Sequence, residues 1–303
     1  MGNTMILITG ATATIGSNLT FILARNKIPV RALVRDKTKI SEALSDLEIE
    51  FVEGDFTKPD TLDKALEGVD SAFLVSPGDR DLVEFQANFI DAAKKAKLKH
   101  LVKISSIGTG PEALYSVGRW HHEVEKRIEQ SGIPFTFVRA HSFMQNFFVH
   151  ASFIQREGAF LAPMGDGRIP MIDVRDIVMV LAVILTSENH EGKTYEITGP
   201  QAISYSEAAD VFTEVLGKPV KFVDTPLSKT RENLLQGEWP EWMVDDVISL
   251  YRFFREGHAT EVTDTVEAII ERKPGNFEQF VKDYAPIFKG EDGTESTETE
   301  KKD

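Results

Sequence analysis

A small-residue turn close to the N-terminus has the residue types and spacing of a phosphate-binding loop. An apolar run over residues 5–9 ends at Gly10, and Ala13 and Gly16 follow at intervals of three residues before a helical pattern. Gly10 permits a tight turn out of a strand, and Gly16 permits close packing of the next helix on a sheet. Backbone N–H groups at the start of that helix would face a pyrophosphate. The residues predicted around this group are Gly10, Thr12, Ala13, Thr14, Ile15 and Gly16.

Taken alone, the turn is also compatible with an ordinary strand–turn–helix connection that needs Gly10 only for its backbone geometry. A second strand over residues 30–34 favours the dinucleotide interpretation, because Arg35 and Asp36 follow it where such a unit binds the adenosine ribose. An acidic residue there binds the 2′-hydroxyl of NADH, whereas an arginine binds the 2′-phosphate of NADPH. Arg35 comes first and lysines follow it, so we expect NADPH, with NAD as the alternative. A solvated cluster of surface charges is the non-binding interpretation.

The first half of the chain alternates strand-like and helical patterns, which would position this turn at one edge of a sheet. The expected strands span residues 5–9, 30–34, 49–53, 71–76, 101–105 and 135–139. The helical patterns span residues 18–25, 61–66, 82–96 and 118–131. Several strands are apolar at consecutive residues, as a parallel sheet covered on both faces requires. The pattern predicts an α/β fold with a doubly wound parallel sheet of the Rossmann type.

The regular alternation ends after Arg139, where a segment rich in aromatic residues and new helical patterns follow. We therefore predict an NAD(P)-binding Rossmann domain over residues 1–145, to which the chain also returns later. A smaller C-terminal α/β domain over residues 146–290 is expected mainly to bind substrate. Residues 291–303 are charged, small polar or glycine, which predicts a disordered acidic tail.

The composition of the 303 residues excludes several classes of chemistry. A formal net charge of −14 argues against nucleic acid or an anionic membrane as the partner. The absence of cysteine excludes disulfides, a thiolate nucleophile and cysteine-ligated metals. We expect no metal at His121 and His122 either, because consecutive histidines point about 100° apart on a helix. No apolar run approaches the ~20 residues of a membrane span, and the first strand leaves no room for a signal peptide, so a cytoplasmic protein is expected.

Several motifs together resemble the NmrA-like family of atypical short-chain dehydrogenases and reductases. They are residues 9–12, the strand end at Arg35, residues 54–56, residues 131–139 with the sequence Ser-Gly-Ile-Pro, and residues 143–146 with the sequence Phe-Met-Gln-Asn. The resemblance implies an NAD(P)-binding domain, a smaller substrate domain and a reductase similar to those acting on triphenylmethane dyes and quinones. It also leaves open a non-catalytic regulator that senses the cofactor, since the family contains such members. The further expected cofactor contacts are Asp55, Phe56, Ser76, Ser105, Ser106 and Phe143.

Two departures from the family's pattern concern the loop and the proton donor. The middle loop position, usually glycine, is Ala13, whose methyl group is tolerated where φ is negative. The Tyr-x-x-x-Lys pair of typical short-chain dehydrogenases is missing, because Val117 and His121 hold its positions. His121 is our candidate catalytic residue, for a hydrogen bond to the nicotinamide ribose or a proton transfer, with pairing to Glu125 as the structural alternative. Tyr115 imitates the missing tyrosine in its spacing to an arginine but is interpreted as a loop residue.

The aromatic segment after the sixth strand supplies an expected apolar wall for the substrate. The family's pattern places this segment beside the nicotinamide, and a flat conjugated substrate requires an apolar pocket. The expected substrate contacts are Trp120, Phe143, Met144, Asn146 and Phe147. Asp173 and Asp176 are interpreted as a helix cap and an arginine partner. We therefore expect an NADPH-dependent reductase that passes hydride to an electron-poor conjugated acceptor, such as a quinone, dye or enone, with little acid assistance.

Overall fold

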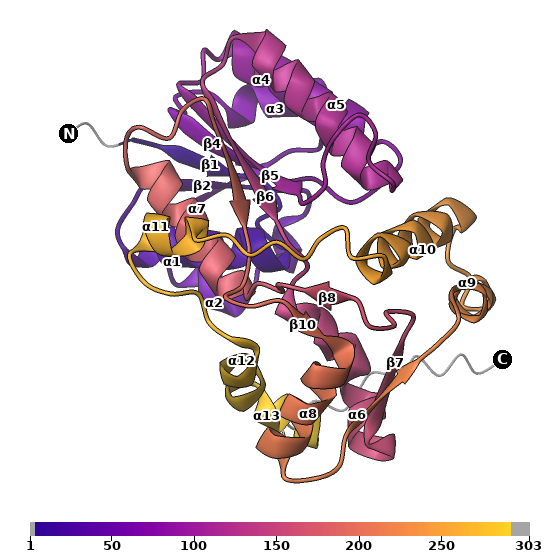
Figure 1. Ribbon diagram of the computed structural model, residues 1–303. Coiled ribbons are helices and arrows are strands. Elements are labelled where there is room, and N and C mark those ends of the chain that lie inside the picture. Colours follow the sequence, from indigo (N-terminus) through magenta and orange to yellow (C-terminus); the bar gives the residue numbers. More distant parts are fainter. Residues whose placement is uncertain (1–3, 292–303) are drawn as a thin grey trace, which may run out of the picture. The chain divides into compact units, whose positions relative to one another are not determined.

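The computed structural model describes residues 4–291, and the chain forms two compact units (Figure 1). The first unit contains residues 4–141, Val174–Thr198 and Thr263–Pro274. The second contains Ser142–Asp173, Gly199–Val262 and residues 275–291. The predicted domain boundary at residue 145 stays a prediction; in the structure, the chain first passes between the units after His141. The predicted tail lies outside the described residues, apart from its first residue.

A seven-stranded parallel sheet forms the centre of the first unit. Its strands are β1 (Ile6–Ile8), β2 (Val30–Val34), β3 (Ile49–Glu53), β4 (Ser71–Leu74), β5 (His100–Ser106), β6 (Phe135–Ala140) and β9 (Lys193–Ile197). The spatial order is β3-β2-β1-β4-β5-β6-β9, so the strand order reverses between β1 and β4. This is a doubly wound sheet of the Rossmann type, which confirms the predicted fold class. Sheets of this kind bind ligands at the carboxyl ends of the strands beside that reversal.

Helices cover both faces of this sheet (Figure 1). The helices on one face are α3 (Pro59–Ala65), α4 (Leu82–Lys95) and α5 (Ser116–Ser131). The helices on the other face are α1 (Thr14–Arg25), α7 (Val174–Thr186) and α11 (Thr265–Ile270). The three residues of β1 are at most 1% exposed, because both faces are covered. This burial accounts for the consecutive apolar residues in the sequence of the strand.

The largest shift from a predicted boundary in the first unit is at the start of α1, and α5 also starts early. α1 begins at Thr14 and α5 at Ser116, ahead of the residues 18 and 118 that the pattern indicated. Both helices follow an extended residue, Ala13 or Tyr115, whose side chain forms no capping hydrogen bond. The usual sequence signal of a helix start is therefore absent at both positions. Two short helices that the pattern did not indicate are η1 (Lys37–Lys39) and α2 (Glu42–Ser45).

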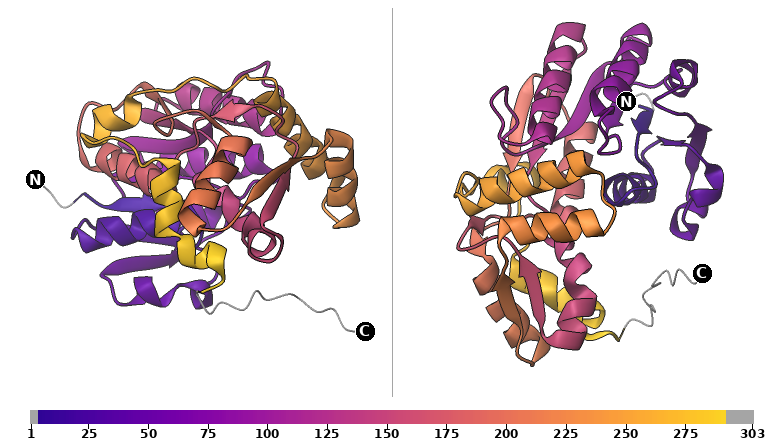
Figure 2. Two further views of the ribbon diagram at one scale, coloured as in Figure 1. Left: turned by 60° about the horizontal axis from the view of Figure 1, so that its bottom comes forward. Right: turned by 90° about the vertical axis from the view of Figure 1, so that its right-hand side faces the viewer.

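The second unit combines two small sheets with helices around an aromatic core. β8 (Arg168–Ile169) pairs antiparallel with β10 (Ile203–Ser204), and β7 (Ala159–Ala162) pairs parallel with β11 (Lys221–Asp224). The helices are η2 (Met144–His150), α6 (Ala151–Glu157), α8 (Tyr205–Leu216), α9 (Leu227–Gln236), α10 (Glu241–Arg255), α12 (Phe277–Asp283) and α13 (Ala285–Lys289). α9 and α10 lie side by side (Figure 2). No helix formed by residues 4–291 is both long and apolar enough to cross a membrane.

Candidate functional site

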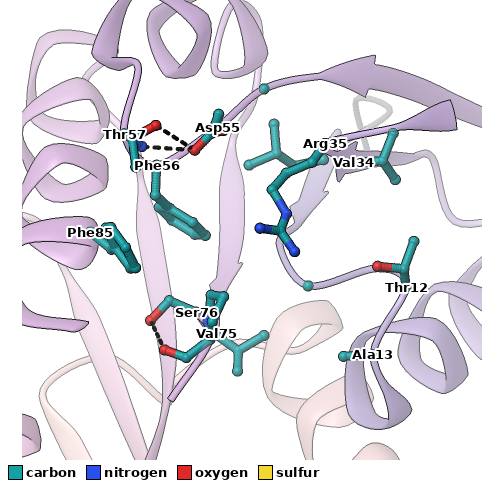
Figure 3. Close-up of a pocket in the computed structure, with 14 residues that line it drawn as sticks. Thr12, Ala13, Val34, Arg35, Asp55, Phe56, Thr57, Val75, Ser76 and Phe85 are labelled. Atoms are coloured by element: carbon teal, nitrogen blue, oxygen red, sulfur yellow. Dashed lines mark hydrogen bonds between the residues drawn. The ribbon is translucent and has the colours of Figure 1, made fainter. Parts of the chain in front are cut away.

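A pocket of about 370 Å³ lies in the first unit at the carboxyl ends of β1, β2, β3 and β4, with one residue from α4 (Figure 3). Its lining residues are Gly10, Thr12, Ala13, Leu33, Val34, Arg35, Gly54, Asp55, Phe56, Thr57, Val75, Ser76, Pro77 and Phe85. The volume is typical of small-molecule and cofactor sites. The pocket therefore lies where the strand order reverses, which is the ligand-binding position of an open α/β sheet.

The turn after β1 leaves no room for a side chain at either of its glycines. Gly10 has a φ of +63°, and a Cβ added to it would lie 2.5 Å from Cγ1 of Val75. A Cβ added to Gly16 would lie 2.2 Å from the carbonyl oxygen of Gly10. Thr9 fixes the end of β1 against β4, because its Oγ1 accepts a hydrogen bond from the N–H of Val75 at 2.8 Å. Both glycine positions therefore exclude any side chain on steric grounds.

The start of α1 is suited to an anion. Ala13 is the N-cap residue, with φ −99° and ψ 163°, so its methyl group causes no backbone strain. The Ala13 side chain forms no capping bond, and the first turn contains no acidic residue. The first N–H groups of a helix have no intrahelical partner and carry a partial positive charge. Because Thr12 and Ala13 line the pocket, this end of α1 fits a pyrophosphate group.

Arg35 and Asp36 have separate roles after β2. Arg35 lines the pocket with an exposed side chain, and Figure 3 shows its guanidinium group pointing into the pocket. Asp36 instead caps η1, since its Oδ1 accepts hydrogen bonds from Oγ1 and N–H of Thr38 at 2.6 and 2.9 Å. The bond from the hydroxyl, followed by that from the N–H, holds the pKa of Asp36 below its usual value. The guanidinium group of Arg35 therefore lines the pocket, and the carboxylate of Asp36 does not.

Asp55 and Phe56 form the wall of the pocket after β3. Oδ1 of Asp55 accepts hydrogen bonds from N–H and Oγ1 of Thr57, both at 2.9 Å (Figure 3). The bond from the Thr57 N–H is the main cause that lowers the pKa of Asp55, and the charge of Arg35 contributes less. The ionised carboxylate retains acceptor positions for a nucleotide. Phe56 stacks on Phe85 with 6.4 Å between the ring centroids, which adds an apolar surface.

The predicted cofactor contacts are distributed over four places. Those that line the pocket are Gly10, Thr12, Ala13, Arg35, Asp55, Phe56 and Ser76. Thr14, Ile15 and Gly16 form the first turn of α1, directly after Ala13, and are not among the lining residues. Ser105 and Ser106 end β5, which is the strand next to β4. Phe143 belongs to the second unit, and its contact with the cofactor stays a prediction.

The hydroxyl group of Tyr115 is held by other groups of the first unit. Tyr115 is 2% exposed, and its hydroxyl donates to the carbonyl oxygen of Ile107 and lies 2.9 Å from Oγ of Ser106. These contacts fix the loop between β5 and α5. The geometry therefore supports the interpretation of Tyr115 as a loop residue and not as a proton donor.

His121 lies on α5 in contact with a buried lysine of β5. Its Nδ1 is 2.8 Å from Nζ of Lys103, and the same Nζ donates to the carbonyl oxygen of Ile104 at 2.9 Å. Lys103 is 0% exposed, and this burial lowers its pKa to about 7. Burial, and secondly the charge of Lys103, lower the pKa of His121 well below its usual value. His121 is therefore a neutral imidazole near pH 7.

Glu125 pairs with Arg139 and not with His121, which was the structural alternative for His121. Oε1 and Oε2 of Glu125 accept hydrogen bonds from Nε and Nη2 of Arg139 at 3.2 and 2.7 Å. The Glu125 side chain is 3% exposed, and Arg139 also lies 3.6 Å from Glu196. This bidentate pair connects α5 with β6 and stabilises the packing of the helix on the sheet.

The carboxylates of Asp173 and Asp176 are also engaged. Oδ1 of Asp176 accepts from Nη2 of Arg272 at 2.7 Å, which is the expected arginine pair. Oδ1 of Asp173 accepts from Nε2 of Gln145 at 2.9 Å. Throughout residues 4–291, no group of three or more His, Asp or Glu side chains is arranged to hold a metal ion.

The predicted substrate residues occur in both units. Trp120 is partly buried against the core of the first unit. Met144 and Phe147 are each 1% exposed in the second unit, where aromatic rings surround Phe147 at centroid distances of 5.0–5.9 Å. These two are core residues in the structure, and their burial gives no support to direct substrate contact. The roles of Phe143, which is partly buried, and Asn146, which is exposed, stay predictions.

Lys103 is the residue of this region that sequence reasoning missed. It stands in β5 between Val102 and Ile104, both buried, and a charged residue inside an apolar strand was the available signal. Thr57, Val75 and Phe85 were also missed as lining residues of the pocket, and no motif distinguishes them in the sequence.

Known proteins match this chain over almost its whole length. The model of the NmrA-like family matches residues 2–281. The chain is 37% identical over 284 residues to the NAD(P)H azoreductase of Xenophilus azovorans, with 94% of this chain and 99% of that protein covered.

Two solved structures in complex with the reduced or oxidised cofactor have the same fold. The NADPH-dependent quinone oxidoreductase of Escherichia coli with NADPH has a TM-score of 0.85 at 25% identity, covering 93% of this chain and 100% of that one. The Citrobacter triphenylmethane reductase with NADP(H) has a TM-score of 0.82 at 25% identity, covering 92% and 99%. Together with the glycine turn, the pocket at the strand reversal and the order of the sheet, these matches show that the chain belongs to the NmrA-like family of atypical short-chain dehydrogenases and reductases.

Proposed function

We propose that this NAD(P)H-dependent oxidoreductase uses NADPH to reduce azo compounds, quinones and cationic aromatic dyes. The pocket at the strand reversal carries the proposal, because it joins a glycine turn, a helix N-terminus and an inward-pointing arginine in one cavity. The names of the relatives describe the reduction of conjugated, electron-poor acceptors, and this supports the choice of acceptor.

The residues of the pocket fit the parts of NADPH. The turn from Gly10 to Gly16 and the start of α1 would hold the pyrophosphate. Arg35 would bind the 2′-phosphate, because its guanidinium group points into the pocket, whereas the carboxylate of Asp36 binds Thr38 and does not line the pocket. Asp55 and Phe56 would border the adenosine with a carboxylate acceptor and an apolar ring.

When bound, NADPH supplies a hydride, which carries two electrons to the acceptor. The protein then has to provide orientation, exclusion of water and, for some acceptors, a proton. The hydroxyl of Tyr115 is unsuited to the last task, because it is buried and bonded to Ile107 and Ser106. His121 is the residue that we assign to the proton, since it is only partly buried and no hydrogen bond within residues 4–291 engages its Nε2.

Consumption of NADPH, followed by its absorbance, tests the proposal with an azo dye, a quinone, a cationic triphenylmethane dye and an enone. We expect consumption with the first three acceptors well above the rate without acceptor. Calorimetric titration with NADPH is the parallel measurement, because it reports binding without turnover. Tight binding with no consumption across the panel would contradict the proposal and would indicate a cofactor-sensing binding protein.

A further inference from the structure

The ammonium group of Lys103 is buried in the first unit and lies in direct contact with the imidazole of His121. The proposed function assigns no role to this lysine. Lys103 is fully buried, and its Nζ has two neighbouring acceptors, the carbonyl oxygen of Ile104 at 2.9 Å and Nδ1 of His121 at 2.8 Å. An ammonium group has three donors and no acceptor. When Lys103 is charged, Nδ1 of His121 must therefore accept, and the ring proton must be on Nε2.

The surroundings of Lys103 leave it few other partners. Its register neighbours in the sheet are Leu74 of β4 and Phe137 of β6, both apolar. The charged groups that act on it are Glu125 of α5 and Arg139 of β6, and these two bind one another through two hydrogen bonds. The ammonium is thus directed toward His121, and the carboxylate of Glu125 is neutralised mainly by a different cation.

We propose that Lys103 is a positioning residue that fixes the tautomer of His121 and replaces the proton that His121 gives to a reduced acceptor. The inference rests on the proposed function, because it needs an acceptor that becomes an anion after hydride addition.

The protons and electrons of this step balance. The acceptor gains a hydride and becomes an anion, and the anion then takes the proton from Nε2 of His121. At the same time Nδ1 of His121 takes a proton from Nζ of Lys103, so the imidazole stays neutral and the lysine becomes a neutral amine. Solvent later gives a proton to Nε2 of His121, and Nδ1 returns its proton to the amine of Lys103, which restores the starting tautomer and the ammonium group. The burial of Lys103 brings its pKa to about 7, so both of its forms are accessible near neutral pH.

The tautomer can be read without cofactor or substrate by ¹⁵N NMR of protein labelled at its seven histidines. The signals of His121 are assigned by their loss in His121→Asn. In the wild type at pH 6 to 7 we expect Nδ1 without a proton and Nε2 with one. In Lys103→Met, which has a similar length and suits the apolar strand, we expect a mixture of tautomers and protonation of His121 closer to its ordinary pKa of about 6.5. A wild-type ring with the proton on Nδ1 would overturn the inference, and this result does not depend on the folding of the variant.

The proton transfer is tested by comparing two acceptors in the loaded enzyme. Hydride addition to the central carbon of a cationic triphenylmethane dye gives a neutral product and needs no proton, whereas addition to an azo group leaves an anion that needs one. In Lys103→Met we expect kcat for the azo compound to fall at least about tenfold more than kcat for the dye. In the wild type, kcat for the azo compound should fall as the pH rises above about 7, because Lys103 loses its proton.

Lys126→Met is the matched control, because it removes an exposed lysine from the same helix as His121. We expect this variant to keep the wild-type ratio between the two acceptors. Equal losses with azo compound and dye in Lys103→Met would assign Lys103 a structural role only and would overturn the inference. A wild type with the expected tautomer that reduces neither acceptor would instead contradict the proposed function, so the two failures are distinguishable.

Discussion

Replacement of Arg35 by alanine gives the sharpest test of how the pocket selects its cofactor. Arg35 is exposed, lines the pocket and forms no hydrogen bond or ion pair with any other group of residues 4–291. Its removal therefore breaks no hydrogen bond or ion pair and ends only a minor charge interaction with Asp55, so we expect the free energy of unfolding to change by no more than about 0.5 kcal/mol. Any change in cofactor affinity then reports the interaction with the cofactor itself.

The size of the effect follows from the charges. A hydrogen bond to a charged group contributes about 1.5–3 kcal/mol, and an arginine–phosphate pair belongs to this class. Loss of the pair corresponds to a decrease in NADPH affinity from about tenfold to just over a hundredfold. NADH lacks the 2′-phosphate, so its affinity should change by less than about threefold.

Calorimetric titration of both cofactors into the wild type, Arg35→Ala and Lys37→Ala measures this difference. Lys37 is the control, because it is also exposed and close in sequence but does not line the pocket. We expect Lys37→Ala to retain the wild-type preference. Equal losses of NADPH and NADH affinity in Arg35→Ala would refute the assignment of Arg35 to the 2′-phosphate.

Three further predictions concern the turn, the tyrosine and the buried ion pair. Gly10→Val should abolish NADPH binding in calorimetric titrations, because Gly10 has a positive φ and an added Cβ would lie 2.5 Å from Val75. Unchanged affinity in a folded variant would show that the turn does not hold the cofactor. Tyr115→Phe should keep kcat within about threefold, since its hydroxyl is bonded internally, whereas a loss of about a hundredfold or more would identify it as the acid. Glu125→Ala should lower the free energy of unfolding by about 3 kcal/mol in urea titrations, because it leaves Arg139 without its bidentate partner. A decrease of less than about 1 kcal/mol would contradict the stabilising role of the pair.

The fold of the first unit could be predicted from sequence because its signals are local. Consecutive apolar residues marked the buried strands, and Gly10 and Gly16 marked a turn whose close contacts exclude a side chain. The strands of the second unit are only two to four residues long, which is too short for a periodic pattern. The starts of α1 and α5 were misplaced because neither has a side-chain cap.

The candidate site could be predicted only in part, because several of its features depend on three-dimensional contacts. Adjacent Arg35 and Asp36 suggest opposite cofactors, and only the hydrogen bonds from Thr38 show that the carboxylate is occupied. The aromatic ring of Phe147 suits a substrate wall and a hydrophobic core equally in sequence, and only its burial distinguishes them. The partner of His121 is 18 residues away in the chain, so no local motif indicated the contact with Lys103.

Transfer of deuterium from cofactor to product is the most direct test of the central claim that the protein is an NADPH-dependent hydride donor to conjugated acceptors. The wild type is incubated with a cationic triphenylmethane dye and with NADPH that carries deuterium at one or the other face of C4. The account predicts a colourless product with one deuterium on its central carbon, detected by mass spectrometry, from one of the two cofactor epimers only. A colourless product without deuterium from either epimer, or no product while NADPH binds tightly, would contradict it.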